Sequence, residues 1–374
     1  MPFLLALLSL FSSVVHADEP PPALAASAWL LVDHATGQVL AERNPGQKVE
    51  PASLTKIMSA YVVFAALRAG KLSHDQTANV SEKAWKAIGS RMFIEPRQTV
   101  TVDELLQGMI VQSGNDAVIA LAEAVAGSEA AFVAMMNAEA RRLGMADTHY
   151  ANATGLPEPS HLTSARDLAR LTGALLRDFP EEYKRFAVKD YTWNKIRQYN
   201  RNRLLWLDPA IDGVKTGHTE SAGFCLIAAR HDGARRLIAV VLGAASDQAR
   251  VQETLALLHY GYRAYEAARL YDQDEALTRL KIFKGAEATV GAGFASPFVI
   301  SLPKGVAVAR ERLKVEVASR QPLVAPVRRG DRVATLRLAL DGRPFAEFPL
   351  VALDDVPVAG PLGRAWDSLK LLLQ

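Results

Sequence analysis

The chain contains almost no cysteine. Cys225 is the only one among 374 residues, so no disulfide can form within a chain, and its apolar neighbours in Phe224–Ala228 predict a buried strand thiol. Neither sign of charge dominates, because 43 Lys and Arg stand against 40 Asp and Glu, for a net charge of +3. So small an excess gives no reason to expect a nucleic-acid partner. Length and the 49% hydrophobic share predict a globular protein of about two domains.

The N-terminal apolar run is too short to cross a bilayer. It extends from Phe3 to Val15, and no Lys or Arg precedes it. It leads into Val15-His16-Ala17, whose outer residues suit a signal-peptidase site, and then into the proline-rich Pro20–Pro22. We therefore expect residues 1–17 to be a signal peptide and the protein to be exported. A buried N-terminal strand or helix is the alternative.

Hydrophobic periodicity predicts a first domain of mixed α/β class over residues 18–272. Alternating residues indicate a hairpin over 29–41, and strands over 223–229 and 237–242 are expected to return to the same sheet. A helix that is apolar nearly all round is expected from Pro51 to about Gly70, and such a helix belongs inside a domain. Further helices are expected over 103–125, 128–143 and 164–176.

The hydrophobic pattern of the sequence changes after about residue 276. Period-two alternation and a hairpin signal at Asp341-Gly342 predict a small all-β domain over 276–358, with Pro349 indicating an edge strand. Residues 359–374 form an amphipathic helix in which Leu362, Trp366, Leu369 and Leu373 recur at helical spacing. Such a helix can lie in a membrane interface or pack on the β-rich domain, and physics alone leaves both open.

Three short motifs supply the residue types needed for acyl transfer through a serine ester. Ser53 and Lys56 share one helix face in Ser53-Leu54-Thr55-Lys56, so a desolvated Lys56 can take the proton of Ser53. In Ser113-Gly114-Asn115, Ser113 can relay a proton to the leaving amine, while Asn115 can hold Lys56 and the substrate amide. Lys215-Thr216-Gly217 is expected to form an edge strand, with Lys215 and Thr216 binding a carboxylate and Gly217 allowing close backbone approach.

The trio is far more specific than any one motif. Ser301-Leu302-Pro303-Lys304 also fits the first pattern, but it contains proline and lies in the β-rich domain, so it is interpreted as structural. The ordered set is the pattern of penicillin-binding proteins and class A β-lactamases.

The chain resembles the low-molecular-mass penicillin-binding proteins that act as serine-type D-alanyl-D-alanine carboxypeptidases. The likeness covers about residues 25–265 and extends well beyond the trio. It is carried by Pro51–Lys56, Ser90–Phe93, Gln112–Ala117, Thr154–Pro157, Thr163–Leu168, Asn200–Asn202, Asp212–Thr219 and Ala222–Leu226.

That resemblance implies a β-lactamase/transpeptidase-like fold with an antiparallel sheet and a helical cluster, and a peptidase acting on peptidoglycan stem peptides. Ser53 would attack the D-Ala-D-Ala carbonyl, and penicillins would acylate the same residue. The backbone N–H groups of Ser53 and His218 would form the oxyanion hole, with Arg250 near the substrate carboxylate. No metal or cofactor is implied. The expected location is the periplasmic face of the cytoplasmic membrane, with the C-terminal helix on that surface.

Three other functions remain as alternatives. A class A β-lactamase requires a Glu-x-x-Leu-Asn segment, and the candidate region Glu158–Thr163 does not match it. A D,D-endopeptidase of the same family is disfavoured by the β-rich domain and the tail. A non-catalytic cell-wall-binding module would be marked by loss of the nucleophile or the lysine, and neither is lost.

Overall fold

The structure is a computed structural model that describes residues 19–372 apart from 234, 307–309 and 320. The predicted signal peptide and Leu373 lie outside the described residues. The chain divides into two compact units, one spanning Pro21–Tyr262 and one containing Arg263–Gln374 together with the segment that ends at Pro20. The expected division at 272–276 falls after β10 (Tyr265–Tyr271), whereas β10 pairs with β13 (Phe298–Pro303) of the second unit.

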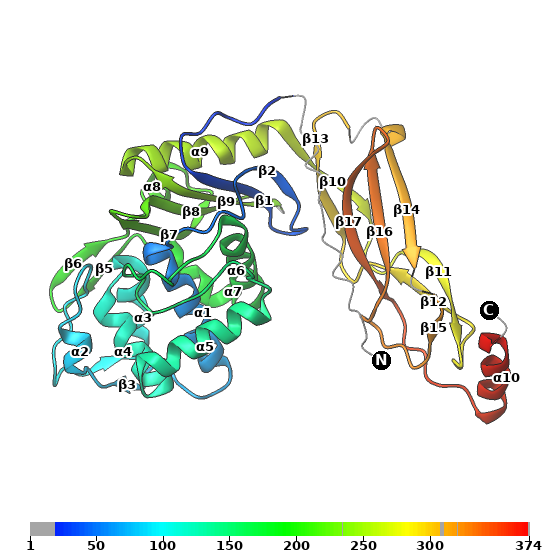
Figure 1. Cartoon of the computed structure of the whole chain (residues 1–374), viewed down its shortest axis with the longest axis horizontal. Helices are drawn as coiled ribbons and strands as arrows, with labels where there is room; N and C mark the ends of the chain where they lie inside the picture. Colours follow the sequence, from blue (N-terminus) through cyan, green and yellow to red (C-terminus); the bar gives the residue numbers. More distant parts are fainter. Residues whose placement is uncertain (1–18, 234, 307–309, 320, 373–374) are drawn as a thin grey trace. The chain divides into compact units, whose positions relative to one another are not determined.

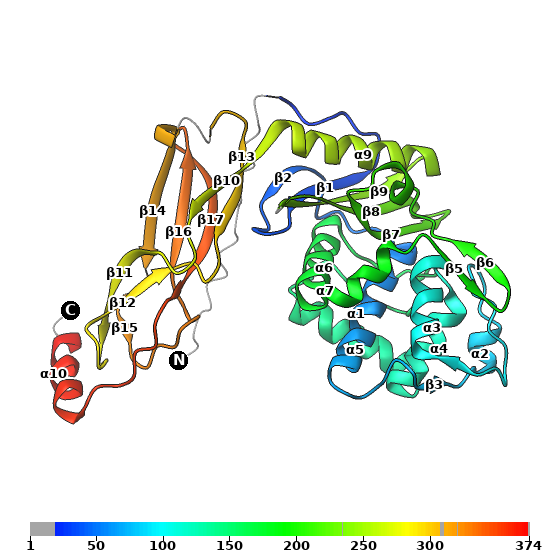
Figure 2. The same ribbon diagram turned by 180° about the vertical axis from the view of Figure 1, so that it is seen from behind.

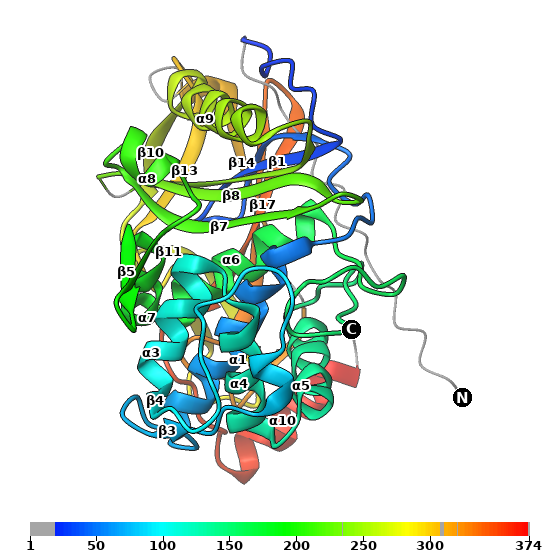
Figure 3. The ribbon, with the colours of Figure 1, turned by 90° about the vertical axis from the view of Figure 1, so that its left-hand side faces the viewer.

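The first unit is built on a five-stranded antiparallel sheet with helices on both faces. The strands run in the order β2 (Val39–Arg43), β1 (Ala28–Asp33), β9 (Arg235–Ala244), β8 (Gly223–Asp232) and β7 (Ile211–Thr219). Helix α9 (Asp247–Ala264) covers one face, and the helical cluster lies against the other (Figures 1 and 3). This is the mixed α/β class that the periodicity predicts, with the expected hairpin formed by β1 and β2.

Helix α1 (Thr55–Arg68) runs through the centre of the helical cluster. A short 3-10 turn, Ala52–Leu54, precedes it, and nearly every α1 side chain is buried, as expected for a helix that is apolar all round. The other helices of the unit are α2 (Glu82–Trp85), α3 (Val102–Gln107), α4 (Asn115–Ala126), α5 (Glu129–Arg142), α6 (Ala165–Asp178), α7 (Pro180–Tyr183) and α8 (Leu204–Leu207), with a 3-10 turn at Lys184–Ala187. Two small two-stranded sheets pair β3 (Thr77–Ala78) with β4 (Val100–Thr101) and β5 (Asp190–Trp193) with β6 (Ile196–Tyr199), and only the second is a hairpin.

The prediction of one continuous helix over 103–125 was wrong. The helix breaks after α3 into a π-helical segment, Gly108–Gln112, and then reverses at Ser113, which adopts the left-handed conformation with φ 68°. Left-handed geometry cannot continue a right-handed helix, so α4 begins afresh at Asn115. The break places the second motif between two helices instead of inside one.

The second unit is β-rich. Its main sheet has the order β14 (Leu313–Ser319), β16 (Arg332–Leu340), β17 (Arg343–Ala352), β12 (Thr289–Gly293), β11 (Ala276–Phe283) and β15 (Leu323–Val324), with one 3-10 turn at Arg310–Arg312. Its own apolar core includes Ile300, Leu336 and Leu350. The prediction that Pro349 marks an edge strand was wrong, because β17 lies between β16 and β12. The proline is tolerated because β12 pairs with β17 only at Val351 and Ala352.

The expected C-terminal helix is present as α10 (Pro361–Leu372), which lies beside β11 (Figure 2). Lys284 N–H donates to the Asp367 carboxylate at 2.7 Å, which ties the helix to the β-rich unit. In the part of the chain that the structure describes, no single helix has the length and apolar character to cross a membrane; α4 and α5 meet that test only as a pair bent by 84°.

Candidate active site

The first motif places a serine and a buried amine in contact at the start of α1. Ser53 is partly exposed, and Lys56 is 1% exposed. Lys56 Nζ lies 3.0 Å from Ser53 Oγ and donates to the Thr154 carbonyl at 2.6 Å. The i, i+3 spacing therefore brings the two side chains together as expected, and the Thr154 carbonyl fixes the amine from the opposite side.

Burial prepares Lys56 to act as a base. Desolvation lowers the pKa of Lys56 to about 7; Asp116 opposes this shift and Arg201 adds to it. A group with a pKa near the working pH has a large neutral fraction and still binds a proton well, which is the optimum for general-base catalysis. From the sequence, Lys215 is expected to be a second cation that lowers the pKa of Lys56. In the structure that cation is Arg201, and Lys56 instead lowers the pKa of Lys215.

The second and third motifs meet through a serine–lysine contact. Lys215 Nζ donates to Ser113 Oγ at 2.9 Å and to the Thr216 carbonyl at 3.0 Å, and both side chains are buried. Burial first, and then Lys56, Arg201 and Arg250, hold the pKa of Lys215 well below its usual range. Because the left-handed turn directs Ser113 toward Lys215, the helix break described above creates this contact.

The edge strand β7 approaches the nucleophile closely. A Cβ added at Gly217 would lie 3.0 Å from the Pro51 carbonyl oxygen and 3.2 Å from Ser53 N, distances that side chains rarely tolerate. Gly217 therefore permits the backbone contact that the sequence predicts. Thr216 is 5% exposed, and the next residue, His218, has an exposed side chain whose ring stacks on Phe224 with 3.9 Å between centroids.

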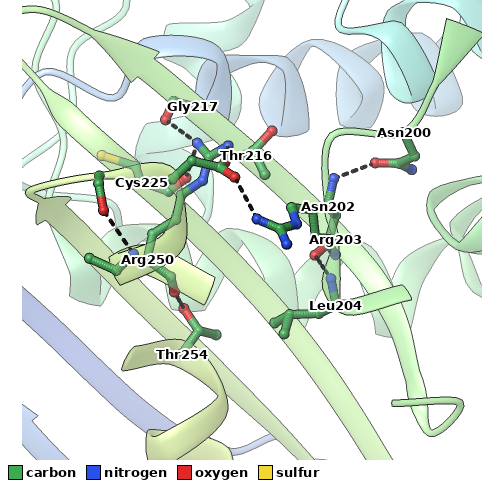
Figure 4. A network of polar contacts seen from close by, with 12 residues as sticks. Asn200, Asn202, Arg203, Leu204, Thr216, Gly217, Cys225, Arg250 and Thr254 are labelled. Atoms are coloured by element: carbon green, nitrogen blue, oxygen red, sulfur yellow. Dashed lines mark hydrogen bonds and ion pairs between the residues drawn. The ribbon is translucent and has the colours of Figure 1, made fainter. Parts of the chain in front are cut away.

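Arg250 lies behind β7 and is bound to its backbone. Its Nη1 donates to the Gly217 carbonyl at 3.0 Å and to the Cys225 carbonyl at 3.4 Å, and its Nη2 pairs with Asp247 (Figure 4). The guanidinium is 7% exposed. The structure thus brings Arg250 to the third motif, where it holds the strand and adds positive charge.

The side-chain amide of Asn115, in the second motif, has one atom without a hydrogen-bond partner among the described residues. Its Nδ2 donates to the Ile88 carbonyl at 2.6 Å, whereas its buried Oδ1 has no hydrogen-bond partner among the described residues. The expected contact between Asn115 and Lys56 is not formed, because Lys56 contacts Ser53 and Thr154 instead. A buried amide oxygen without a partner remains available to an N–H donor from a substrate.

Comparison with known proteins agrees with this geometry. A family model described as D-alanyl-D-alanine carboxypeptidase matches residues 14–246. The chain belongs to the D-alanyl-D-alanine carboxypeptidase family. A second model, the C-terminal domain of penicillin-binding protein 5, matches residues 265–358. The chain is 40% identical to D-alanyl-D-alanine carboxypeptidase DacC of Escherichia coli, over 98% of this chain and 94% of that protein.

Solved structures extend the comparison to the fold. Penicillin-binding protein 5 from Haemophilus influenzae is similar with a TM-score of 0.82 and 36% identity, over 91% of this chain and 99% of that one. Penicillin-binding protein D2 from Listeria monocytogenes, in an ampicillin-bound form, has a TM-score of 0.60 and 30% identity, over 65% of this chain and 100% of that one. The protein is thus a serine-type D-alanyl-D-alanine carboxypeptidase, a hydrolase with the fold of penicillin-binding proteins.

Four further residues of this carboxypeptidase bear on the site, and none of them has an individual role predicted from the sequence. Thr154 supplies the carbonyl that holds Lys56. Arg201 adds positive charge to both lysines, and Asn202 next to it donates to the Gly213 carbonyl of β7 at 3.0 Å. Asp116 accepts hydrogen bonds from the backbone N–H groups of 92, 93 and 94. All four lie in segments that carried the family resemblance, which was the only signal available.

The pKa of Lys56 gives the carboxypeptidase a testable pH dependence. If neutral Lys56 takes the proton of Ser53, the second-order rate of acylation should fall about tenfold for each pH unit below about 7 and level off above it. Stopped-flow acylation by a fluorescent penicillin across this range measures the profile. A flat profile through pH 7 would exclude Lys56 as the titrating base.

Proposed function

We propose that Ser53 is the nucleophile of this carboxypeptidase and that Lys56 is its base in acylation. Neutral Lys56 removes the Ser53 proton as Oγ attacks the carbonyl carbon of the penultimate D-alanine. The C–N bond then breaks, and the terminal D-alanine leaves after its amine receives, through Ser113, the proton that Lys56 removed; Ser113 is hydrogen-bonded to Lys215. Water hydrolyses the ester and returns the proton to Ser53. The contact between Ser53 and a buried amine of lowered pKa carries this assignment.

We assign the remaining site residues to substrate binding. Lys215 and Thr216 are proposed to hold the terminal carboxylate, and Asn115 Oδ1 to accept the substrate amide N–H. The carboxylate would also raise the pKa of Lys215, because an opposite charge favours the ammonium ion. The backbone N–H groups of Ser53 and His218 are proposed to bind the oxyanion. Arg250 is proposed to hold the strand that carries His218, through its hydrogen bond to the Gly217 carbonyl. The close approach of Gly217 to Ser53 N supports the pairing of these two segments.

Penicillin labelling followed by peptide mapping tests the assignment. A strained lactam should acylate Ser53, and digestion should recover the label on the peptide that contains it. Ser301→Ala is the matched control, because Ser301 lies in the same Ser-x-x-Lys pattern but is buried in β13. Label on any other serine would overturn the assignment. Slow loss of the label together with release of D-alanine from diacetyl-Lys-D-Ala-D-Ala is expected of a carboxypeptidase, whereas rapid nitrocefin turnover without peptide cleavage would favour a β-lactamase.

We further propose that the protein is exported to the periplasm and that α10 attaches it to the membrane surface. The signal-like N-terminal sequence supports export. The apolar residues of α10 are largely uncovered, since Leu362 is 89% exposed, Trp366 61% and Leu369 51%. An amphipathic helix gains free energy by burying such a face in the lipid interface.

Deletion of residues 359–374 should release the protein from membranes and leave its activity on soluble peptide unchanged. Ultracentrifugation with vesicles of anionic phospholipid measures the bound fraction, and colorimetric D-alanine release measures the activity. Ser368→Ala, a change of a partly exposed polar residue on the same helix, should leave binding intact. Full membrane association of the truncated protein would contradict the anchoring role.

A further inference from the structure

A buried chain of hydrogen bonds ends on the peptide bond that precedes the nucleophile. Thr55 Oγ1 donates to the Ala52 carbonyl at 2.8 Å, and it lies 2.8 Å from Nε2 of His161. His161 Nδ1 accepts from the backbone N–H groups of Ala151 at 3.1 Å and Asn152 at 3.4 Å. Thr55 is fully buried and His161 is 1% exposed, so water cannot replace these bonds.

The direction of each bond in this chain is fixed by the donors and acceptors available. Because Nδ1 accepts from backbone N–H groups, a neutral His161 carries its proton on Nε2 and donates it to Thr55 Oγ1. The single proton of the Thr55 hydroxyl is then directed to the Ala52 carbonyl. Burial, together with the neighbouring His149 and Lys56, lowers the pKa of His161 to about 4, so the ring stays neutral at ordinary pH. The Tyr150 ring packs edge-on against it at 5.6 Å.

The peptide held in this way is the one whose N–H belongs to Ser53. In a trans peptide the C=O and the following N–H point in opposite directions, so fixing the Ala52 carbonyl also fixes the Ser53 N–H. Ala52 has φ 47°, a conformation that costs a non-glycine residue free energy and must be held by its surroundings. Two glycines lie close against this peptide: a Cβ at Gly155 would meet the Ala52 oxygen, and a Cβ at Gly217 would lie 3.2 Å from Ser53 N.

We propose that His161 and Thr55 are positioning residues that hold the Ala52–Ser53 peptide with its N–H directed at the developing oxyanion. This inference rests on the proposed function, in which Ser53 is acylated and its own N–H binds the oxyanion. The two residues touch neither substrate nor reacting atoms, and they act through the peptide plane. A misdirected oxyanion donor weakens transition-state stabilisation more than substrate binding, so kcat and the acylation rate should fall while KM changes little.

Paired substitutions separate this role from simple packing. Thr55→Val keeps the shape of the side chain and removes the hydroxyl, and we expect it to slow penicillin acylation and D-alanine release about 10- to 100-fold. Thr55→Ser restores the hydroxyl and should recover most of the rate. His161→Leu should resemble Thr55→Val, whereas His161→Gln retains a donor for Thr55 and should lose less. Thr172→Val is the matched control, because Thr172 is a buried threonine of α6 whose hydroxyl also donates to a carbonyl, that of Leu168.

The rates are measured per active site, counted by the fluorescent penicillin bound at completion, so that partial unfolding does not mimic a catalytic loss. Since both residues act on one peptide, the Thr55→Val/His161→Leu double variant should be no slower than the slower single variant. The acylation rate of the variants should still fall below about pH 7, because Lys56 retains its hydrogen-bond partners. Any of three results would overturn the inference. The Thr55→Val variant could acylate at the wild-type rate per site, the losses could multiply in the double variant, or the fall in the acylation rate could move away from pH 7. Failure of Ser53 to be labelled in the unaltered protein would instead overturn the proposed function.

Discussion

Replacement of Lys56 by methionine is expected to lower the rate of penicillin acylation by about 10²- to 10⁴-fold, the typical contribution of a general base. Methionine has a similar length and no charge, so it fits the buried position and removes the cost of desolvating an amine. The folded state should therefore be at least as stable as before. Time-resolved labelling with a fluorescent penicillin measures the rate, and thermal denaturation checks the fold.

Lys71→Met is the control for this substitution, because Lys71 is exposed beyond the end of α1 and contacts no site residue. It should acylate at the normal rate. If Lys56→Met reacted within tenfold of the unaltered protein, the base would have to be sought at Lys215, the other buried amine of the site.

Replacement of Asp116 by alanine is expected to reduce the free energy of unfolding by about 3 kcal/mol or more. Its fully buried carboxylate accepts from the backbone N–H groups of Met92 at 2.9 Å, Phe93 at 2.8 Å and Ile94 at 3.2 Å, and no alanine atom can accept these bonds. The same loop is joined to the second motif, since Asn115 N–H donates to the Ser90 carbonyl at 2.7 Å. Loss of the carboxylate should therefore also slow acylation.

Urea denaturation measures this loss as a lower transition midpoint. Asp190→Ala is the matched control, because that carboxylate forms an exposed ion pair with Arg197, and exposed pairs contribute little. An unchanged midpoint for Asp116→Ala would show that water can enter and accept the hydrogen bonds of the three loop N–H groups.

The sequence predicted the fold of this protein well wherever a long periodic pattern existed. The buried α1 helix, the β1–β2 hairpin and the β16–β17 hairpin were all expected, because their hydrophobic residues repeat at the helical or strand period. It failed at Ser113, where a π-helical turn and a left-handed residue interrupt an otherwise helical stretch. The polar Ser113-Gly114-Asn115 is a turn signal there, but the apolar residues on both sides of it continue the helical pattern and outweighed it in the prediction.

What the sequence by itself determined is the set of chemical groups: Ser53 and Lys56 one helical turn apart, and the ordered motifs that resemble a family. Helix geometry fixes the first pair wherever the helix forms. Only the tertiary structure decided which groups meet across long separations. It joined Lys215 to Ser113 and Thr154 to Lys56, and it directed Arg250 toward the backbone of Gly217. It also placed His161 behind Thr55. These contacts, and the burial that lowers the pKa of Lys56, arise from packing between distant segments, which short-range spacing cannot encode.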